Sequence, residues 1–351
     1  MRWKQKKTSR EELFRSCKYL ACLDRPQLII RFDANTSSLV SIHADQNIIF
    51  HSLASGEPSR QIVGFNDEII DATFLTAASS STHTHLALAT NSNLIRMYST
   101  TTFDVRLLSG HKDMVLSLDK SIDYRWLASG SKDRTARIWS STEAGDWRCL
   151  AVCEGHAEAV GGVALSRKMD DKGKTGRFLM TASQDRTIKM WDLTSIPLDE
   201  IPEEPIKPRS LATLRAHEKD INALDLSPND SFLASGSLVK LVKIFEVVFN
   251  PGQGGAVRHV GTCKGHKRGV WTVKFSKTDR IVASGAADRT VRIWSLDDFS
   301  CLKVCQIIKS VLTADFRRSH RLGSSSRLLV VRYAARHFCC RRPCQAMEHQ
   351  G

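Results

Sequence analysis

The sequence of 351 residues has no run of about 18 apolar residues, so we expect no membrane-spanning helix. Its basic start, Met1 to Lys7, is not followed by an apolar stretch, and we therefore expect no secretory signal peptide. Without a secretory route the ten cysteines should stay reduced, and none of them belongs to a Cys-x-x-Cys pair. These absences exclude a disulfide scaffold, a membrane protein and a collagen-like chain.

The composition is ordinary in its hydrophobic content and uneven in its charge. A hydrophobic content of 42% is sufficient for a core and argues against wholesale disorder. The net charge of +14 gathers at the two ends: residues 1–10 hold five basic residues and no acid, and residues 317–351 hold eight arginines, no lysine and one acid. Basic ends favour RNA contact or nuclear import, with solvated ends as the alternative.

A ten-residue pattern that ends on an aromatic residue recurs in the chain. Three copies share Asp-Arg-Thr and end on tryptophan, and a fourth keeps the frame without the aspartate; they span residues 130–139, 182–191, 285–294 and 236–245. A histidine precedes the aromatic residue by 28 positions in three copies and by 35 in the copy that contains a polar insertion at residues 169–174. The three identical offsets define one repeat register.

Degenerate copies extend this repeat toward both ends. The aromatic anchors lie 41 to 54 residues apart, at Trp3, Phe50, Tyr98, Trp139, Trp191, Phe245 and Trp294. Within each unit, alternating stretches such as Val270–Phe275 and Ile281–Ser284 have the period of β-strands. Units with four such strands resemble the WD-repeat family, in which they form the blades of a propeller. The expected fold class is therefore all-β, a WD-repeat β-propeller that is incomplete and has about six recognisable blades.

In the WD-repeat family the repeated His, Ser or Thr, Asp and Trp residues form a hydrogen-bonded structural tetrad within each blade. The physics agrees, because a buried tryptophan N–H needs an acceptor, and linked polar groups can satisfy one another. The resemblance implies three tetrads in this chain, made of His111, Ser129, Asp133 and Trp139, of His156, Thr181, Asp185 and Trp191, and of His266, Ser284, Asp288 and Trp294.

The same residue types also make up a Ser-His-Asp catalytic triad. Because the trio recurs in several blades, it indicates a repeat rather than one reactive centre, and no Gly-x-Ser-x-Gly elbow is present. The run Gly173-Lys174-Thr175 lacks the upstream glycine of a phosphate-binding loop. We therefore expect no catalytic residue, no cofactor and no metal, with a metal site at residues 337–344 as the alternative.

The repeat divides the chain into three parts. Residues 1–17 are interpreted as a basic segment with the remnant of a preceding blade, residues 18–316 as an incomplete propeller, and residues 317–351 as a basic tail outside the repeat. Both ends look cut, because Trp3 would lie within a blade and the repeat vanishes after Phe316. A frameshift or an unspliced intron would explain the tail, and a divergent basic extension is the alternative. The ring is then either open or closed by pieces of both ends.

Several stretches, including Ala216–Leu224, Gly265–Val273 and Ser295–Lys303, resemble the second propeller of the transducin-beta-like protein 3 family. The resemblance implies a non-catalytic scaffold subunit of the small-subunit processome, the particle of the nucleus and nucleolus that processes the 18S rRNA precursor. Implied partners are its protein subunits, including other WD-repeat proteins, with pre-rRNA or small nucleolar RNA contacted directly or through them. A general WD-repeat adaptor, such as a ubiquitin-ligase substrate receptor or a signalling scaffold, and a propeller enzyme stay open as alternatives.

Variable loops on a rigid disc predict an interaction platform. The residues before the blade aspartates and after the histidines should open on one rim, and the candidate partner-binding residues are Lys112, Lys132, Gln184, Lys219, Lys264, Lys267 and Arg268. Three of these, Lys264, Lys267 and Arg268, precede Trp271 closely, a combination that is compatible with RNA contact. A solvated rim is the alternative.

Overall fold

The computed structural model describes most of the chain between residues 27 and 314. The described residues are 27–33, 38–43, 47–52, 55, 57–62, 67–76, 84–142, 146–168, 177–197, 202–251, 254–306 and 313–314. Every long regular element among them is a β-strand, and these residues contain no helix that is long and apolar enough to cross a membrane. The predicted segments 1–17 and 317–351 lie outside this part of the chain. So does the alternative metal site at residues 337–344.

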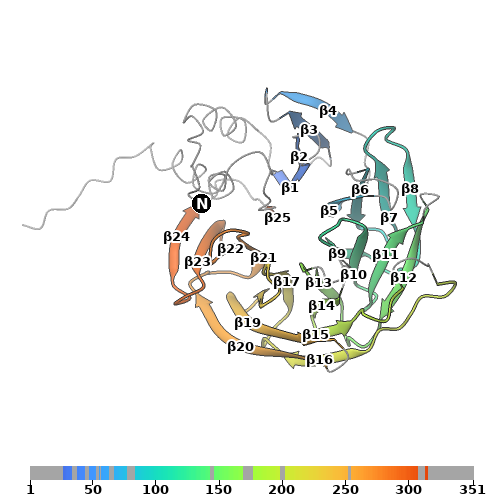
Figure 1. Ribbon diagram of the computed structural model, residues 1–351. Helices are drawn as coiled ribbons and strands as arrows, with labels where there is room; N and C mark the ends of the chain where they lie inside the picture. Colours follow the sequence, from blue (N-terminus) through green and yellow to red (C-terminus); the bar gives the residue numbers. More distant parts are fainter. Residues whose placement is uncertain are drawn as a thin grey trace, which may run out of the picture.

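Six sheets are arranged like blades around a common centre (Figure 1). The first three are built from β1 (Gln27–Asp33), β2 (Ser38–His43), β3 (Ile48–Ser52) and β4 (Pro58–Ile62); from β5 (Ile69–Leu75), β6 (His85–Thr90), β7 (Ile95–Ser99) and β8 (Val105–Leu108); and from β9 (Val115–Lys120), β10 (Trp126–Ser131), β11 (Ala136–Ser141) and β12 (Trp147–Cys153).

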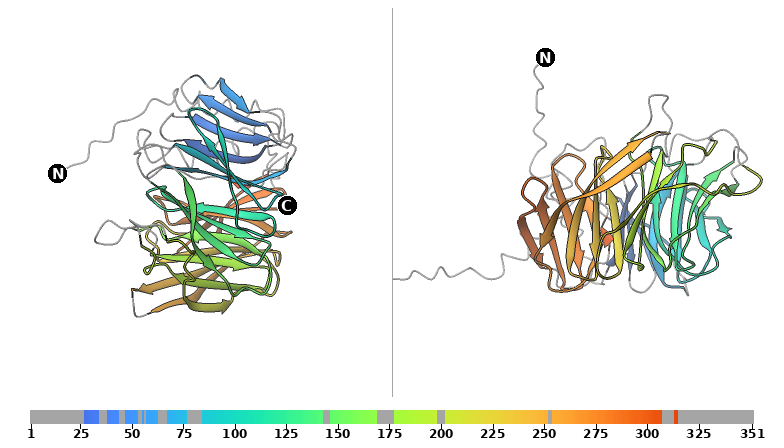
Figure 2. Two further views of the ribbon diagram at one scale, coloured as in Figure 1. Left: turned by 90° about the vertical axis from the view of Figure 1, so that its right-hand side faces the viewer. Right: turned by 90° about the horizontal axis from the view of Figure 1, so that it is seen from below.

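The other three sheets continue the same order of antiparallel strands. They are built from β13 (Val160–Leu165), β14 (Phe178–Ser183), β15 (Thr187–Asp192) and β16 (Ser210–Arg215); from β17 (Ile221–Leu226), β18 (Phe232–Ser237), β19 (Leu241–Asn250) and β20 (Gly254–Lys264); and from β21 (Val270–Phe275), β22 (Ile281–Ala286), β23 (Thr290–Ser295) and β24 (Cys301–Gln306). Seen from the side, the strands run across the thickness of the disc (Figure 2). The predicted all-β propeller with six recognisable blades is confirmed.

The third strand of each blade shows how the repeat produces its structure. In β15, Ile188 and Met190 pack into one core cluster, and Trp191 on the opposite face of the strand packs into another, while Thr187 and Lys189 are partly exposed. The predicted aromatic anchors from Phe50 to Trp294 all lie on such third strands. The repeat register therefore predicts the strand that carries each anchor.

The hydrophobic core lies between the blades. One cluster joins Ile138 on β11 to Val163 on β13 and Leu179 on β14, all of them almost completely buried. Further clusters in the same way combine side chains of each blade with those of the next. Since a single four-stranded sheet buries its faces only against its neighbours, the blades stabilise one another.

Carboxylates also connect neighbouring inner strands. Asp71 on β5 accepts a hydrogen bond from the Leu118 amide on β9 (2.9 Å). Asp119 on β9 accepts one in the same way from the Leu165 amide of β13 (2.8 Å). These bonds fix the position of each inner strand against the next, and thereby the geometry around the centre of the disc.

By its sequence pattern, the segment 310–316 is interpreted as the first inner strand of another unit, and residues 313 and 314 are the part of it that the structure describes. Its described residues form β25 (Thr313–Ala314), which pairs in parallel with Ile29 and Ile30 of β1. β25 therefore extends the first sheet to five strands, and the described residues contain no seventh sheet.

Candidate functional site

The blade of β9 to β12 brings the predicted residues His111, Ser129, Asp133 and Trp139 together. The Trp139 indole N–H donates to Ser129 Oγ (2.8 Å), and His111 Nε2 lies 2.7 Å from the same Oγ. His111 Nδ1 lies 2.8 Å from Asp133 Oδ2, and this carboxylate also accepts the N–H groups of Lys112 and Thr135. The bonding assigns the Nδ1–H tautomer, so that Ser129 donates to Nε2.

The two titratable groups that are hydrogen-bonded here, His111 and Asp133, differ in charge because the pKa of each is lowered. Burial lowers the pKa of His111, and the bond to Asp133 only partly opposes it, so the imidazole stays neutral. Burial alone would raise the pKa of Asp133, but hydrogen bonds from His111, Thr135 and the Lys112 amide outweigh it and lower the pKa well below its usual range. A neutral histidine therefore donates to an ionised aspartate.

Two further blades repeat this geometry. His156 lies 2.8 Å from Asp185 and 2.7 Å from Thr181 Oγ1, to which the Trp191 indole donates (2.8 Å). The corresponding separations in the blade of β21 to β24 are 3.0 Å for His266–Asp288, 2.7 Å for His266–Ser284 and 2.7 Å for Trp294–Ser284. The hydroxyl, imidazole and carboxylate thus recur with the same partners in three blades.

The blade of β17 to β20 keeps only half of the arrangement. His217 Nε2 still lies 2.7 Å from Ser235 Oγ, but Val239 and Phe245 stand where the other blades have aspartate and tryptophan. The buried His217 Nδ1 has no hydrogen-bond partner among the described residues. Burial, together with the positive charge of Lys243, lowers the pKa of His217 to about 3.

The tetrads are closed to solvent, which decides their chemistry. The His111 and His266 side chains are 0% exposed, and those of Asp133 and Asp288 only 5% and 6%. Each hydroxyl already bridges an indole and an imidazole, and each carboxylate already accepts several hydrogen bonds. A nucleophile must reach its substrate, and the buried hydroxyls of these tetrads have no access to one.

A second charged cluster, at the centre of the disc, was missed by the sequence analysis. The partly buried Arg167 guanidinium lies 2.9 Å from Asp119 and 3.2 Å from Asp225, and donates to the Lys120 carbonyl (3.0 Å). Lys274 approaches Asp225 from the other side (3.0 Å). These residues belong to four successive blades, so the cluster neutralises its own charges and ties the inner strands together. Its only sequence signal is the Leu-Asp pair that Asp119 and Asp225 share near the ends of their strands.

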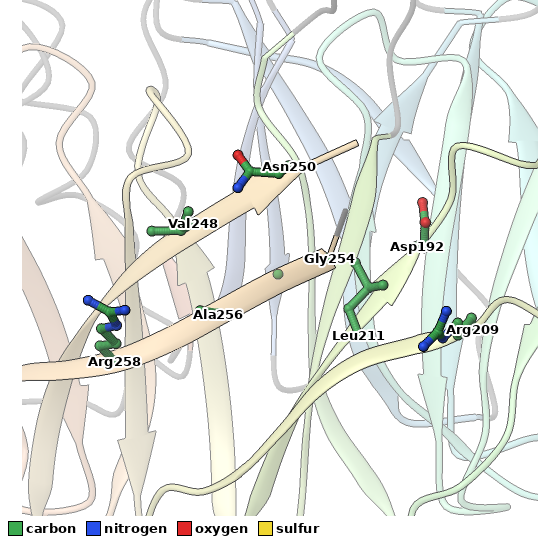
Figure 3. A pocket seen from close by; sticks show the side chains of 9 residues that line it. Asp192, Arg209, Leu211, Val248, Asn250, Gly254, Ala256 and Arg258 are labelled. Atoms are coloured by element: carbon green, nitrogen blue, oxygen red, sulfur yellow. The ribbon is translucent and has the colours of Figure 1, made fainter. Parts of the chain in front are cut away.

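A groove of about 510 Å³ lies between β16 and the far end of the β19–β20 hairpin (Figure 3). Arg209 and Leu211 line one side, and Val248, Asn250 and Arg258 line the other. Its one carboxylate, Asp192, accepts hydrogen bonds from the amide and hydroxyl of Thr194 at 2.9 and 2.6 Å. The groove contains no histidine and no second acid, and therefore lacks an acid–base pair.

Thiols and metal ligands do not converge in the described part of the chain. Cys149, Cys153, Cys263 and Cys301 form no disulfide, and no group of three or more histidine, cysteine or acidic side chains could hold a metal ion there. Burial raises the pKa of Cys263 to about 12, so this thiol is not a reactive thiolate.

The predicted rim residues are all exposed, and they share one end of the blades. The turn that contains Lys132 lies beside the loop that contains Lys112, because Asp133 accepts the Lys112 amide. The same bond between Asp288 and the Lys267 amide (2.8 Å) fixes the loop of Lys267 and Arg268 in its own blade. The exposed set comprises Lys112, Lys132, Gln184, Lys219, Lys264, Lys267 and Arg268.

Comparison with known families finds four repeats in this chain. The family model "WD domain, G-beta repeat" matches residues 103–140, 147–192, 208–245 and 257–295. Each match ends on the third strand of a blade, either at the aromatic anchor or one residue beyond it.

Curated relatives match over part of the chain. Transducin beta-like protein 3 of Mus musculus is 34% identical over 210 residues, which cover 59% of this chain and 25% of that protein. The protein of the same name from Homo sapiens is 34% identical over 216 residues, or 60% and 26%. U3 small nucleolar RNA-associated protein 13 of Saccharomyces cerevisiae is 40% identical over 172 residues, or 46% and 21%. The chain thus spans about a quarter of the length of these relatives.

Proposed function

Because the chain is a WD40-repeat protein that resembles transducin beta-like protein 3, we propose that it acts as a non-catalytic scaffold subunit in small ribosomal subunit biogenesis. Its place would be the small-subunit processome, where the 18S rRNA precursor is processed. The tetrads would serve as structural elements that hold each blade in shape, and the exposed rim would carry the partner contacts.

The observation that carries this proposal is the contrast between closed tetrads and an open rim. All the repeated polar groups that could react are buried and mutually bonded, whereas the variable loop residues are exposed. A rigid disc with this distribution presents surfaces and performs no chemistry of its own. The relative from Saccharomyces cerevisiae supports the choice of the processome as the particle, since its name associates that protein with U3 small nucleolar RNA.

The proposal implies particular partners and a place in the cell. The partners are protein subunits of a small nucleolar ribonucleoprotein particle, among them other WD-repeat proteins, and the protein resides in the nucleolus. No cofactor is required, because binding alone performs the function.

Depletion of the gene product tests this function. We expect unprocessed 18S precursor to accumulate on RNA blots while the precursors of the large-subunit RNAs keep their normal amounts, and the tagged protein to lie in the nucleolus. An unchanged precursor pattern would reject the processome role and favour a general WD-repeat adaptor, such as a substrate receptor for ubiquitin ligation.

A further inference from the structure

Trp271 stands apart from the other described tryptophans. The five others are at most 8% exposed, whereas the Trp271 side chain is 45% exposed. It is the extra, unpaired residue of a β-bulge in β21, because the ladder with β22 steps from Val270 directly to Thr272. Asn222, which belongs to the preceding blade, donates a hydrogen bond from its side-chain Nδ2 to the carbonyl of the adjacent Val270 (3.2 Å). A large aromatic ring is thus open to solvent on a fixed backbone.

Turns that carry cationic residues, from two blades, meet the loop that precedes Trp271. The turn of Leu238 and Lys240 packs against Gly269, where an added Cβ would lie 2.8 Å from a Leu238 methyl group. The turn of Ala287 and Arg289 meets the same glycine, because the Ala287 amide donates to the Gly269 carbonyl (2.9 Å). Together these contacts define the Trp271 patch, which consists of Lys240, Lys264, Lys267, Arg268, Trp271 and Arg289.

The charges of the Trp271 patch are not neutralised locally. All five cations are exposed, and none forms an ion pair with any described residue. The only acid in the three contributing segments, 238–240, 264–271 and 287–289, is Asp288, whose carboxylate is taken by His266, Thr290 and the Lys267 amide. The patch therefore has a net positive field around an exposed ring.

We propose that the Trp271 patch binds single-stranded RNA directly, with a base stacked on Trp271 and the flanking phosphates held by the cations. An exposed aromatic ring among cations suits a single strand, because every base has a π-face and every linkage a negative charge. An acidic peptide would use the cations but leave the ring without a partner. The inference goes beyond the proposed function, since a scaffold held only by protein contacts needs no RNA surface.

Binding of a labelled A12 RNA to the full chain, followed by fluorescence anisotropy, tests the inference. Stacking of one base contributes about 1–3 kcal/mol, so Trp271→Ala should weaken binding by about 5-fold to 150-fold, while Trp271→Phe retains most of the affinity. The pair Lys267→Glu and Arg268→Glu should also lower the salt dependence, by about 0.7 in slope for each phosphate that the protein no longer neutralises. The matched control, Arg125→Glu with Arg209→Glu, changes two exposed arginines at the opposite end of the blades and should leave both quantities unchanged.

Tryptophan fluorescence separates the patch from the basic ends of the chain. RNA should quench the emission of the wild-type protein, and the Trp271→Phe variant should bind while losing this quenching. Equal affinity and equal quenching in the wild type and in Trp271→Ala would overturn the proposal, as would competition by a polyglutamate peptide at the same concentration as RNA, which would identify an acidic-peptide site. Because Trp271 is exposed, unchanged melting temperatures should show that all variants fold. These binding results stand whether or not depletion alters rRNA processing.

Discussion

Substituting Val239 by aspartate should complete the half-formed tetrad of the β17–β20 blade and stabilise the protein. The turn is already built for it: Lys240 has φ 69°, as Arg134 and Arg186 have 70° and 73° in the complete blades. The Val239 amide donates to Ser237 Oγ (3.3 Å), as the Asp133 amide does to Ser131 Oγ (3.1 Å). The new carboxylate would therefore stand where it can accept the His217 Nδ1–H.

The expected gain follows from the unpaired nitrogen. A buried polar group without a partner costs about 1–3 kcal/mol, and a charge-assisted bond removes that cost, so Val239→Asp should raise the free energy of unfolding by about 1–2 kcal/mol after desolvation of the carboxylate. The pKa adds a second readout. The pKa of His217 is lowered to about 3 in the folded state, whereas in the unfolded chain it is about 6.5. As the pH drops below about 6.5, His217 is protonated in the unfolded chain but not in the folded protein, so the free energy of unfolding falls. The loss by pH 5 is about 2 kcal/mol.

Urea unfolding at pH 7 and pH 5 measures both effects. The Val239→Asp protein should be more stable at pH 7, and its advantage should grow at pH 5 because the new carboxylate raises the pKa of His217. Lys240→Asp, which introduces an acid at the adjacent exposed position, is the control and should show neither effect. A Val239→Asp protein that is less stable than the wild type, with an unchanged histidine titration, would refute the reasoning.

Three further outcomes are expected. Asp185→Asn should lower the free energy of unfolding by about 1–3 kcal/mol, because it places an amide N–H against His156, and a loss of enzymatic turnover without loss of stability would contradict this. Arg167→Met should cost about 3–5 kcal/mol in urea unfolding by leaving two buried carboxylates without their shared cation, whereas Arg280→Met, which removes an exposed pair, should cost about 0–1 kcal/mol. Limited proteolysis should cut within residues 317–351 before it cuts the blades, and equal resistance would contradict the division at residue 316.

Much of the fold was predictable because the repeat states it several times. The offset from histidine to tryptophan placed the third strands, and the physical need of a buried indole for an acceptor pointed to the residues that converge around Trp139 and Trp191. The pattern also showed that Val239 interrupts the series. It did not show the consequence, an unpaired His217 nitrogen, because that depends on burial.

Features that occur once escaped the sequence analysis. Arg167 follows the end of β13 and is not part of the repeated pattern. Its partners Asp119 and Asp225 lie 48 and 58 residues away along the chain. Only the circular arrangement of the blades brings them together. The close packing of Gly269 against Leu238, which assembles the Trp271 patch from two blades, likewise depends on the spacing between neighbouring sheets. The periodicity of the sequence predicts the features that all blades share, and it does not predict contacts that differ from blade to blade.

Affinity purification of the tagged gene product, with identification of the bound proteins and RNA, tests the central proposal most directly. A scaffold of the small-subunit processome should retain WD-repeat processome subunits together with U3 small nucleolar RNA and unprocessed 18S precursor, and the proteins should remain after mild nuclease treatment. Recovery of ubiquitin-ligase or signalling subunits, with neither U3 RNA nor precursor above the level of an untagged control, would contradict the account.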